Sequence, residues 1–60
     1  MRIYLGEEFD PTTNAKVFCI RSNFDKDQYR IIEEGFLINE YYVDFFDDKH
    51  ATLFLLKYSQ

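Results

Sequence analysis

The 60-residue sequence predicts an α+β fold, a single domain over residues 1–60 in the order β-β-α-β-β. We expect a four-stranded antiparallel sheet with one helix on one face. Three features support this prediction. Two segments near the start alternate in polarity as strands do, a central segment carries helix start and stop signals, and two apolar, aromatic segments follow it.

The first two predicted strands are joined by a short turn. In residues 2–9, one side carries Ile3, Leu5 and Phe9, and the other side is mainly polar. Asp10 followed by Pro11 is typical of a type I turn, so residues 10–14 are expected to reverse the chain. Residues 15–22 then read as a second strand, which makes an antiparallel hairpin with the first.

The predicted helix spans residues 23–34, between Ser22 and Gly35. Ser22 is a suitable N-cap, and Asp25 follows three residues later, where a capping-box acid would lie. Gly35 suits the position just after the helix, where a left-handed backbone is common. A competing interpretation takes residues 29–34, the segment YRIIEE, as a strand.

Residues 36–46 and 51–59 are predicted as the last two strands, with residues 47–50 as the turn between them. Both faces of these strands would then carry large apolar side chains. One helix covers only one face of a sheet. The remaining apolar face therefore predicts a packing partner, either a second copy or another protein.

The formal net charge is −4, and the acids are concentrated in residues 25–48. Nucleic acids and anionic membranes bind basic patches, so this charge argues against both and favours a basic protein partner. The single cysteine provides no disulfide framework and indicates a reducing, intracellular setting. We find no apolar run that resembles a signal peptide or a membrane span, so a soluble, cytoplasmic protein is expected.

The sequence gives only weak support for a metal site or a catalytic pair. Asp44, Asp47, Asp48 and His50 follow no established metal-binding spacing, and a polar turn explains them. Cys19 paired with His50 would need a third, orienting residue, and a small buried side chain explains Cys19 as well. The sequence thus predicts no catalytic residue, no metal and no cofactor, and a protein that is not an enzyme.

The strongest candidate for a binding site is the acidic, aromatic strand near residue 42. Glu40 and Asp44 would lie about 13 Å apart on one face, with Tyr42 between them. Acids in the following turn and at the end of the predicted helix would extend this surface. The complete predicted partner-binding set is Glu33, Glu34, Glu40, Tyr42, Asp44, Asp47 and Asp48.

Carboxylates at strand spacing can imitate a row of DNA phosphates and compete for a basic groove, while aromatic rings supply contact area. The alternative is a half-buried strand whose acids keep the sheet soluble and discourage edge pairing.

In size, acidity and aromatic content, the whole chain resembles phage-encoded inhibitors of host defence, such as anti-CRISPR proteins and other DNA mimics. This group shares no residue motif. The resemblance implies binding to a nucleic-acid enzyme of the host, for example a CRISPR nuclease, in the host cytoplasm. The alternative function is a small assembly module that homo-oligomerises through an aromatic sheet face, and a homodimer fits either hypothesis.

Overall fold

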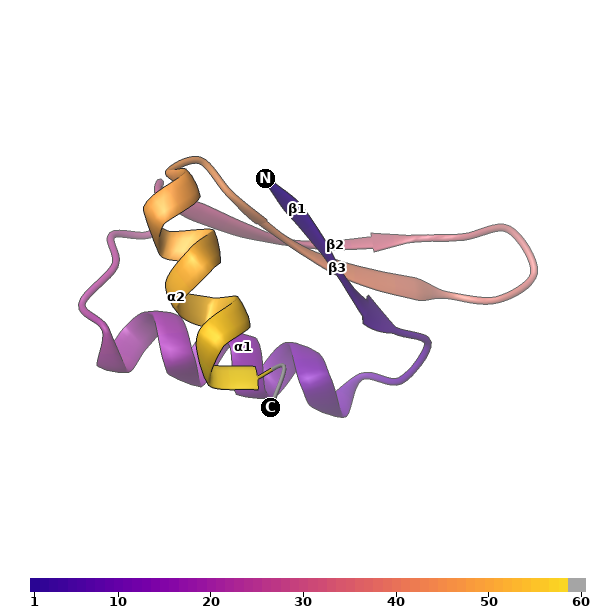
Figure 1. Ribbon diagram of the computed structural model, residues 1–60. Coiled ribbons are helices and arrows are strands. Elements are labelled where there is room, and N and C mark those ends of the chain that lie inside the picture. Colours follow the sequence, from indigo (N-terminus) through magenta and orange to yellow (C-terminus); the bar gives the residue numbers. More distant parts are fainter. Residues whose placement is uncertain (59–60) are drawn as a thin grey trace.

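The computed structural model describes residues 1–58 as an antiparallel sheet with two helices (Figure 1). In chain order the elements are β1 Arg2–Gly6, α1 Asp10–Arg21, β2 Tyr29–Glu34, β3 Glu40–Phe45 and α2 Asp48–Tyr58. The strand order is β1-β3-β2. The fold belongs to the α+β class. The prediction of a four-stranded sheet with one helix is wrong, because residues 1–58 contain three strands and two helices.

Helix α1 occupies the segment that we expected to form a turn and a second strand. Pro11 lies in its first turn, where the missing N–H costs nothing because that group has no partner within the helix. Thr12, Ala15 and Cys19 are buried along one side of the helix. These residues are three and four positions apart, which is the spacing of one face of a helix. The segment follows this helical pattern and not the apparent strand alternation of residues 15–22.

The residues expected to begin a helix instead end α1. Asn23 has a left-handed backbone with φ of 60°. Its N–H donates to Ile20 O at 3.1 Å, and the N–H of Phe24 donates to Cys19 O at 3.0 Å. This pair of bonds is the Schellman motif, in which Asn is a common substitute for Gly. Ser22 is therefore the C-cap of α1 and not the N-cap of a second helix.

The competing interpretation of residues 29–34 as a strand is confirmed, and the helix predicted over residues 23–34 is wrong. β2 pairs with β3 along its whole length, with Ile31 opposite Val43. Cross-strand pairing and burial override the moderate helix propensity of this segment. Gly35 lies in the hairpin between the two strands and not at a helix end.

Helix α2 replaces the strand predicted over residues 51–59; Ser59 lies outside the described residues. Asp47 caps the helix, because its Oδ1 accepts a bond of 2.9 Å from the N–H of Lys49. Ala51 and Phe54, three residues apart, are buried on one side. The expected turn over residues 47–50 is thus the start of this helix.

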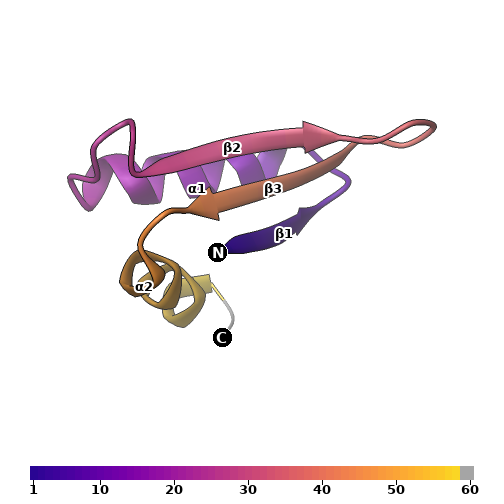
Figure 2. The same cartoon turned by 90° about the horizontal axis from the view of Figure 1, so that it is seen from above.

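The strands predicted over residues 2–9 and 36–46 are confirmed but shorter, as β1 and β3. Both helices lie on the same side of the sheet (Figures 1 and 2). The core between these layers consists of Ala15, Cys19, Val43, Phe45, Ala51 and Phe54. Residues 51–58, which supplied part of the second apolar face in the predicted sheet, instead form a helix that packs on the sheet, so the original reason for expecting a partner no longer holds.

Candidate protein-binding face

The side of the sheet away from the helices is uncovered, and we call it the open face (Figure 2). Side chains alternate along each strand, and Val43 and Phe45 point into the core, so the even-numbered residues of β3 point away from it. The strand registers place their cross-strand neighbours on the same side. The open face consists of Arg2, Tyr4, Arg30, Ile32, Glu34, Glu40, Tyr42 and Asp44.

Two tyrosines and an arginine form the centre of the open face. The rings of Tyr4 and Tyr42, which are cross-strand neighbours, have centroids 5.4 Å apart. The guanidinium carbon of Arg2 lies 5.4 Å from the centroid of Tyr42. Its Nη1 also donates to Glu34 Oε1 at 3.2 Å. Arg2 thus spans β3 above an aromatic ring, a favourable position for a cation.

Nearby carboxylates raise the pKa values of both tyrosine hydroxyl groups. The hydroxyl of Tyr42 donates to Glu40 Oε2 at 2.8 Å, and this hydrogen bond is the largest cause of the raised pKa of Tyr42. The pKa of Tyr4 is raised by partial desolvation and then by the charges of Glu40 and Glu7. We call Tyr4, Glu7, Glu34, Glu40 and Tyr42 the acid–tyrosine cluster.

The structure separates the seven predicted binding residues into three locations. Four of them, Glu34, Glu40, Tyr42 and Asp44, share the open face. Glu33 pairs with Tyr41 on the opposite side of the sheet. Asp47 and Asp48 lie at the start of α2, so they do not prolong the strand.

Internal contacts also neutralise part of the expected row of carboxylates. Asp44 Oδ1 lies 3.4 Å from the Met1 ammonium nitrogen, and its side chain is only 20% exposed. Glu34 is paired with Arg2. The negative charge open to a partner therefore lies nearer Glu40 and Glu7 than Asp44. Tyr4 and Glu7 were absent from the predicted set, although the alternation of residues 2–9 already places Tyr4 opposite to Ile3 and Leu5.

The hairpin between β2 and β3 carries the two most exposed large apolar side chains of residues 1–58, Phe36 and Leu37, with Ile38 next to them. Phe36 is 98% exposed, Leu37 is 89% and Ile38 is 56%. We call these three residues the hairpin tip, which projects beyond the rest of the molecule (Figure 1). At Gly35 φ is +149°, and a Cβ would meet the carbonyl oxygen of Ile38 at 1.9 Å, so this turn requires glycine. Residues 36–38 were expected to lie in a strand, and their exposure was not predicted.

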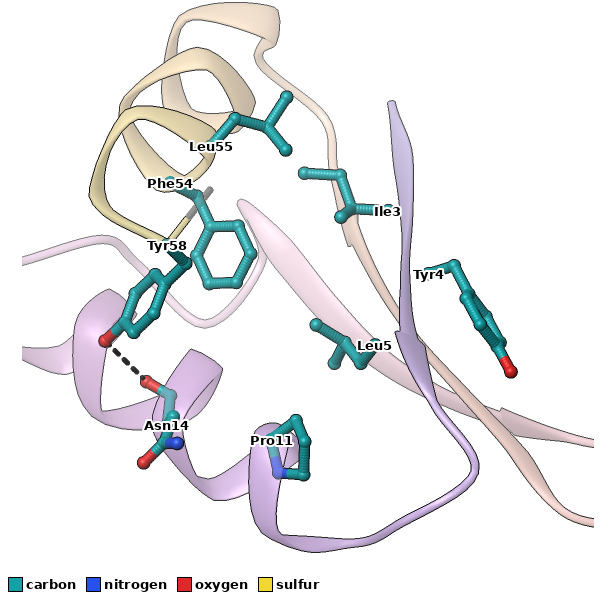
Figure 3. A pocket seen from close by; sticks show the side chains of 8 residues that line it. All are labelled: Ile3, Tyr4, Leu5, Pro11, Asn14, Phe54, Leu55 and Tyr58. Carbon is teal, nitrogen blue, oxygen red and sulfur yellow. Dashed lines mark hydrogen bonds between the residues drawn. The ribbon is translucent and has the colours of Figure 1, made fainter. Parts of the chain in front are cut away.

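A pocket of about 350 Å³ lies between β1, α1 and α2 (Figure 3). Its walls are mainly apolar, with Ile3, Leu5 and Phe54 facing the space. The hydroxyl of Tyr58 is directed at Asn14 O, 3.4 Å away. Within residues 1–58, the lining of this pocket contains no acid, base or nucleophile other than tyrosine hydroxyls.

Cys19 lies in the hydrophobic core, and the ring of His50 packs against an aromatic ring. Cys19 is fully buried, and burial raises its pKa to about 11. The ring of His50 stacks on Phe24 at 3.8 Å, and its Nε2 lies 3.9 Å from Asp47 Oδ2. Within residues 1–58, no group of three or more His, Cys, Asp or Glu side chains is arranged to hold a metal ion. No helix in this part of the chain is long and apolar enough to cross a membrane.

Neither a family model, nor a curated protein, nor a solved structure matches this chain.

Proposed function

We propose that this protein is a non-enzymatic binding module that uses its open face to occupy a basic surface of another protein. The observation that carries the proposal is the acid–tyrosine cluster. The rings of Tyr4 and Tyr42 are in mutual contact, the hydroxyl of Tyr42 donates to Glu40, and the charges of Glu40 and Glu7 raise the pKa of Tyr4. Tyrosines with an apolar ring and a polar tip are typical anchors of protein interfaces.

The charge of the cluster favours a basic partner. Arg2 compensates Glu34, whereas Glu7 and Glu40 have no ion pair among residues 1–58. A partner that brings Lys or Arg to this surface would gain both charge pairing and cation–π contact with the rings. Nucleic-acid enzymes expose such basic grooves, so the partner that we propose is an enzyme of this class, which the protein inhibits by competing with DNA.

The positions of the carboxylates favour a different mode of competition with DNA from the one that the sequence suggested. Asp44 pairs with the Met1 ammonium group, Asp47 caps α2, and Asp48 lies in the first turn of that helix, so we do not base the proposal on a continuous row of phosphate mimics. A compact anchor is better supported, in which two rings supply contact area and two carboxylates supply steering. Steering of this kind increases the association rate and weakens with added salt.

The test uses capture from a cell lysate followed by competition with duplex DNA. We compare the unmodified protein with a Glu7→Gln/Glu40→Gln variant, which removes two charges from the cluster while the new amide oxygen at position 40 can still accept from Tyr42. The matched control is Asp25→Asn/Asp27→Asn, which removes two exposed charges elsewhere. At surface values for each of the two charge pairs, the cluster variant should bind roughly 2- to 30-fold more weakly at low salt.

Duplex DNA should displace the captured partner, and the control variant should bind as the unmodified protein does. A partner that binds DNA and this protein simultaneously would contradict competition with DNA. Equal binding by the cluster and control variants would contradict the assignment of the binding face.

A further inference from the structure

We propose that two copies of this chain pair their β2 strands antiparallel across a two-fold axis, which joins their sheets into one of six strands. This inference does not depend on the proposed partner. β2 lies at the edge of the sheet, with β3 on one side only (Figure 2). An unprotected edge strand is a template for pairing with another strand.

The backbone of β2 has groups directed outward from this edge. The N–H of Phe46 donates to Gln28 O at 3.1 Å, so the even-numbered positions of β2 bond to β3. Bonding positions alternate along an antiparallel strand. The N–H and C=O groups of Tyr29, Ile31 and Glu33 therefore point away from the sheet. The other edge is different, because β1 has a register shift between Tyr4 and Gly6, and such irregularities discourage pairing.

Charge selects the register of the proposed pair. With Ile32 on the two-fold axis, Arg30 of each copy lies opposite Glu34 of the other, which makes two oppositely charged pairs. Arg30 is exposed and forms no ion pair within the described residues. Moving the axis to Glu33 would bring like charges together, and moving it to Ile31 would leave Arg30 opposite Ile32. Opposite charges across strands are stabilising and like charges destabilising.

Apolar surface continues below the free edge. Phe9 is 64% exposed and Ile20 is 63% exposed. Together with Val17 and Ile31 they line a shallow groove between α1 and β2. When the two β2 strands pair, these grooves approach each other and bury apolar area that backbone hydrogen bonds alone do not provide.

The hairpin tip also finds a complementary surface on the second copy. Beside the start of β2 lies a groove of about 890 Å³ whose lining includes Phe24, Lys26 and Tyr29. The tip lies at the opposite end of β2, about 20 Å away at strand spacing. Antiparallel pairing therefore brings each tip, with its flanking acids, beside the basic and apolar groove of the other copy. Both halves of this match belong to one sequence, and for that reason a second copy is the occupant we propose.

A disulfide between two Ile32→Cys chains tests the axis directly. Residue 32 faces itself as a non-hydrogen-bonded pair, with Cα atoms about 4.5 Å apart, which suits a disulfide. In a Cys19→Ala background, this variant should cross-link quantitatively under mild oxidation. The control Tyr4→Cys lies on the same face but far from the axis, and it should cross-link at least about tenfold more slowly.

A proline variant tests the strand edge by sedimentation. Glu33→Pro removes an outward donor and keeps the bonds between β2 and β3, so the dimer should dissociate at least about tenfold more readily than with Glu33→Ala. Arg30→Glu should also weaken the dimer, and adding Glu34→Arg should restore it. If Glu33→Pro fails to fold, the Ile32→Cys cross-link and the Arg30→Glu/Glu34→Arg variant test the proposal in its place.

A monomer at millimolar concentration would overturn the proposal. So would a dimer that tolerates Glu33→Pro and does not cross-link through residue 32, since that dimer would use another surface. Open-ended assemblies would overturn it as well, because a two-fold axis closes at two copies.

Discussion

The hydroxyl of Tyr42 donates a hydrogen bond of 2.8 Å to Glu40, two residues earlier on the same face of β3. This bond requires the proton of Tyr42, and it raises the pKa of that hydroxyl above its ordinary value of 10.0. The folded state therefore retains a proton that the unfolded state loses. Above pH 10, the free energy of unfolding should fall as pH rises, until Tyr42 itself ionises in the folded protein.

Tyr42→Phe should reduce this loss of stability, because its side chain has no proton to lose. Urea unfolding, repeated in steps from neutral pH to beyond pH 10, measures the effect. Tyr4, whose pKa is also raised, will leave a residual decline in the variant. Identical pH profiles for the two proteins would show that the bond between Tyr42 and Glu40 does not form in solution.

Substitutions of Cys19 separate packing from polarity. Cys19→Ala leaves a small cavity beside Val43 and Phe45 in the core cluster and should cost about 1 kcal/mol. Cys19→Ser places a hydroxyl in the same apolar surroundings and should cost about 1–3 kcal/mol. Chemical denaturation compares them, and a Ser variant as stable as the Ala variant would argue against complete burial.

The thiol of Cys19 should also react slowly with alkylating reagents at neutral pH. Its raised pKa of about 11 leaves little thiolate, and burial blocks access. Labelling should become fast only in denaturant. Rapid labelling of the native protein would reveal local opening of α1.

Asn23 tests the Schellman motif that ends α1. Its φ of 60° costs a residue with a Cβ roughly 1–2 kcal/mol, which Asn partly avoids through its short polar side chain. Asn23→Gly should therefore preserve or increase stability, and Asn23→Ala should lower it by about 1 kcal/mol. Thermal unfolding of the pair checks the order, and the reverse order would contradict this C-cap.

Asp47 tests whether the turn before α2 is a free acidic surface or a helix cap. Asp47→Lys removes the acceptor for the N–H of Lys49 and places a positive charge at the positive end of the helix. It should cost about 1–2 kcal/mol, whereas Asp47→Asn should cost much less. Urea unfolding distinguishes the two roles, because charge reversal on the exposed binding surface that the sequence predicted for Asp47 would leave stability almost unchanged.

Gly35 tests the turn that presents the hairpin tip. A methyl group there would meet the backbone of Ile38, and φ of +149° is open almost only to glycine. Gly35→Ala should cost at least about 1–3 kcal/mol, while Phe36→Ser, at a fully exposed position, should change stability by less than about 0.5 kcal/mol. Urea unfolding of protein diluted until it is monomeric measures both effects, and equal losses of stability would contradict the exposed position of the tip.

The sequence by itself determined those features that depend on local chemistry. The alternation of Ile3 and Leu5 with Arg2 and Tyr4 identified β1 and its two faces. The shared face of Glu40, Tyr42 and Asp44 followed from strand period alone and is confirmed by the register with β1 and β2. Helix signals for α1 and α2 were also present, in Pro11 and in the spacing of Ala51 and Phe54. Residues 15–22 and 51–59 were nevertheless interpreted as strands, because their side chains also alternate as in a strand.

Only the tertiary structure decided which local tendency prevailed. Residues 15–20 and 53–58 are apolar enough for strands, yet as helices they cover the sheet side that holds Val43 and Phe45. Residues 29–34 became a strand because pairing with β3 buries Ile31 beside that core. Contacts between distant residues, such as Arg2 with Glu34 and Met1 with Asp44, then determined which carboxylates were left for a partner. Such contacts have no local sequence signal, because the free energy of burial and charge pairing depends on which segments meet in space.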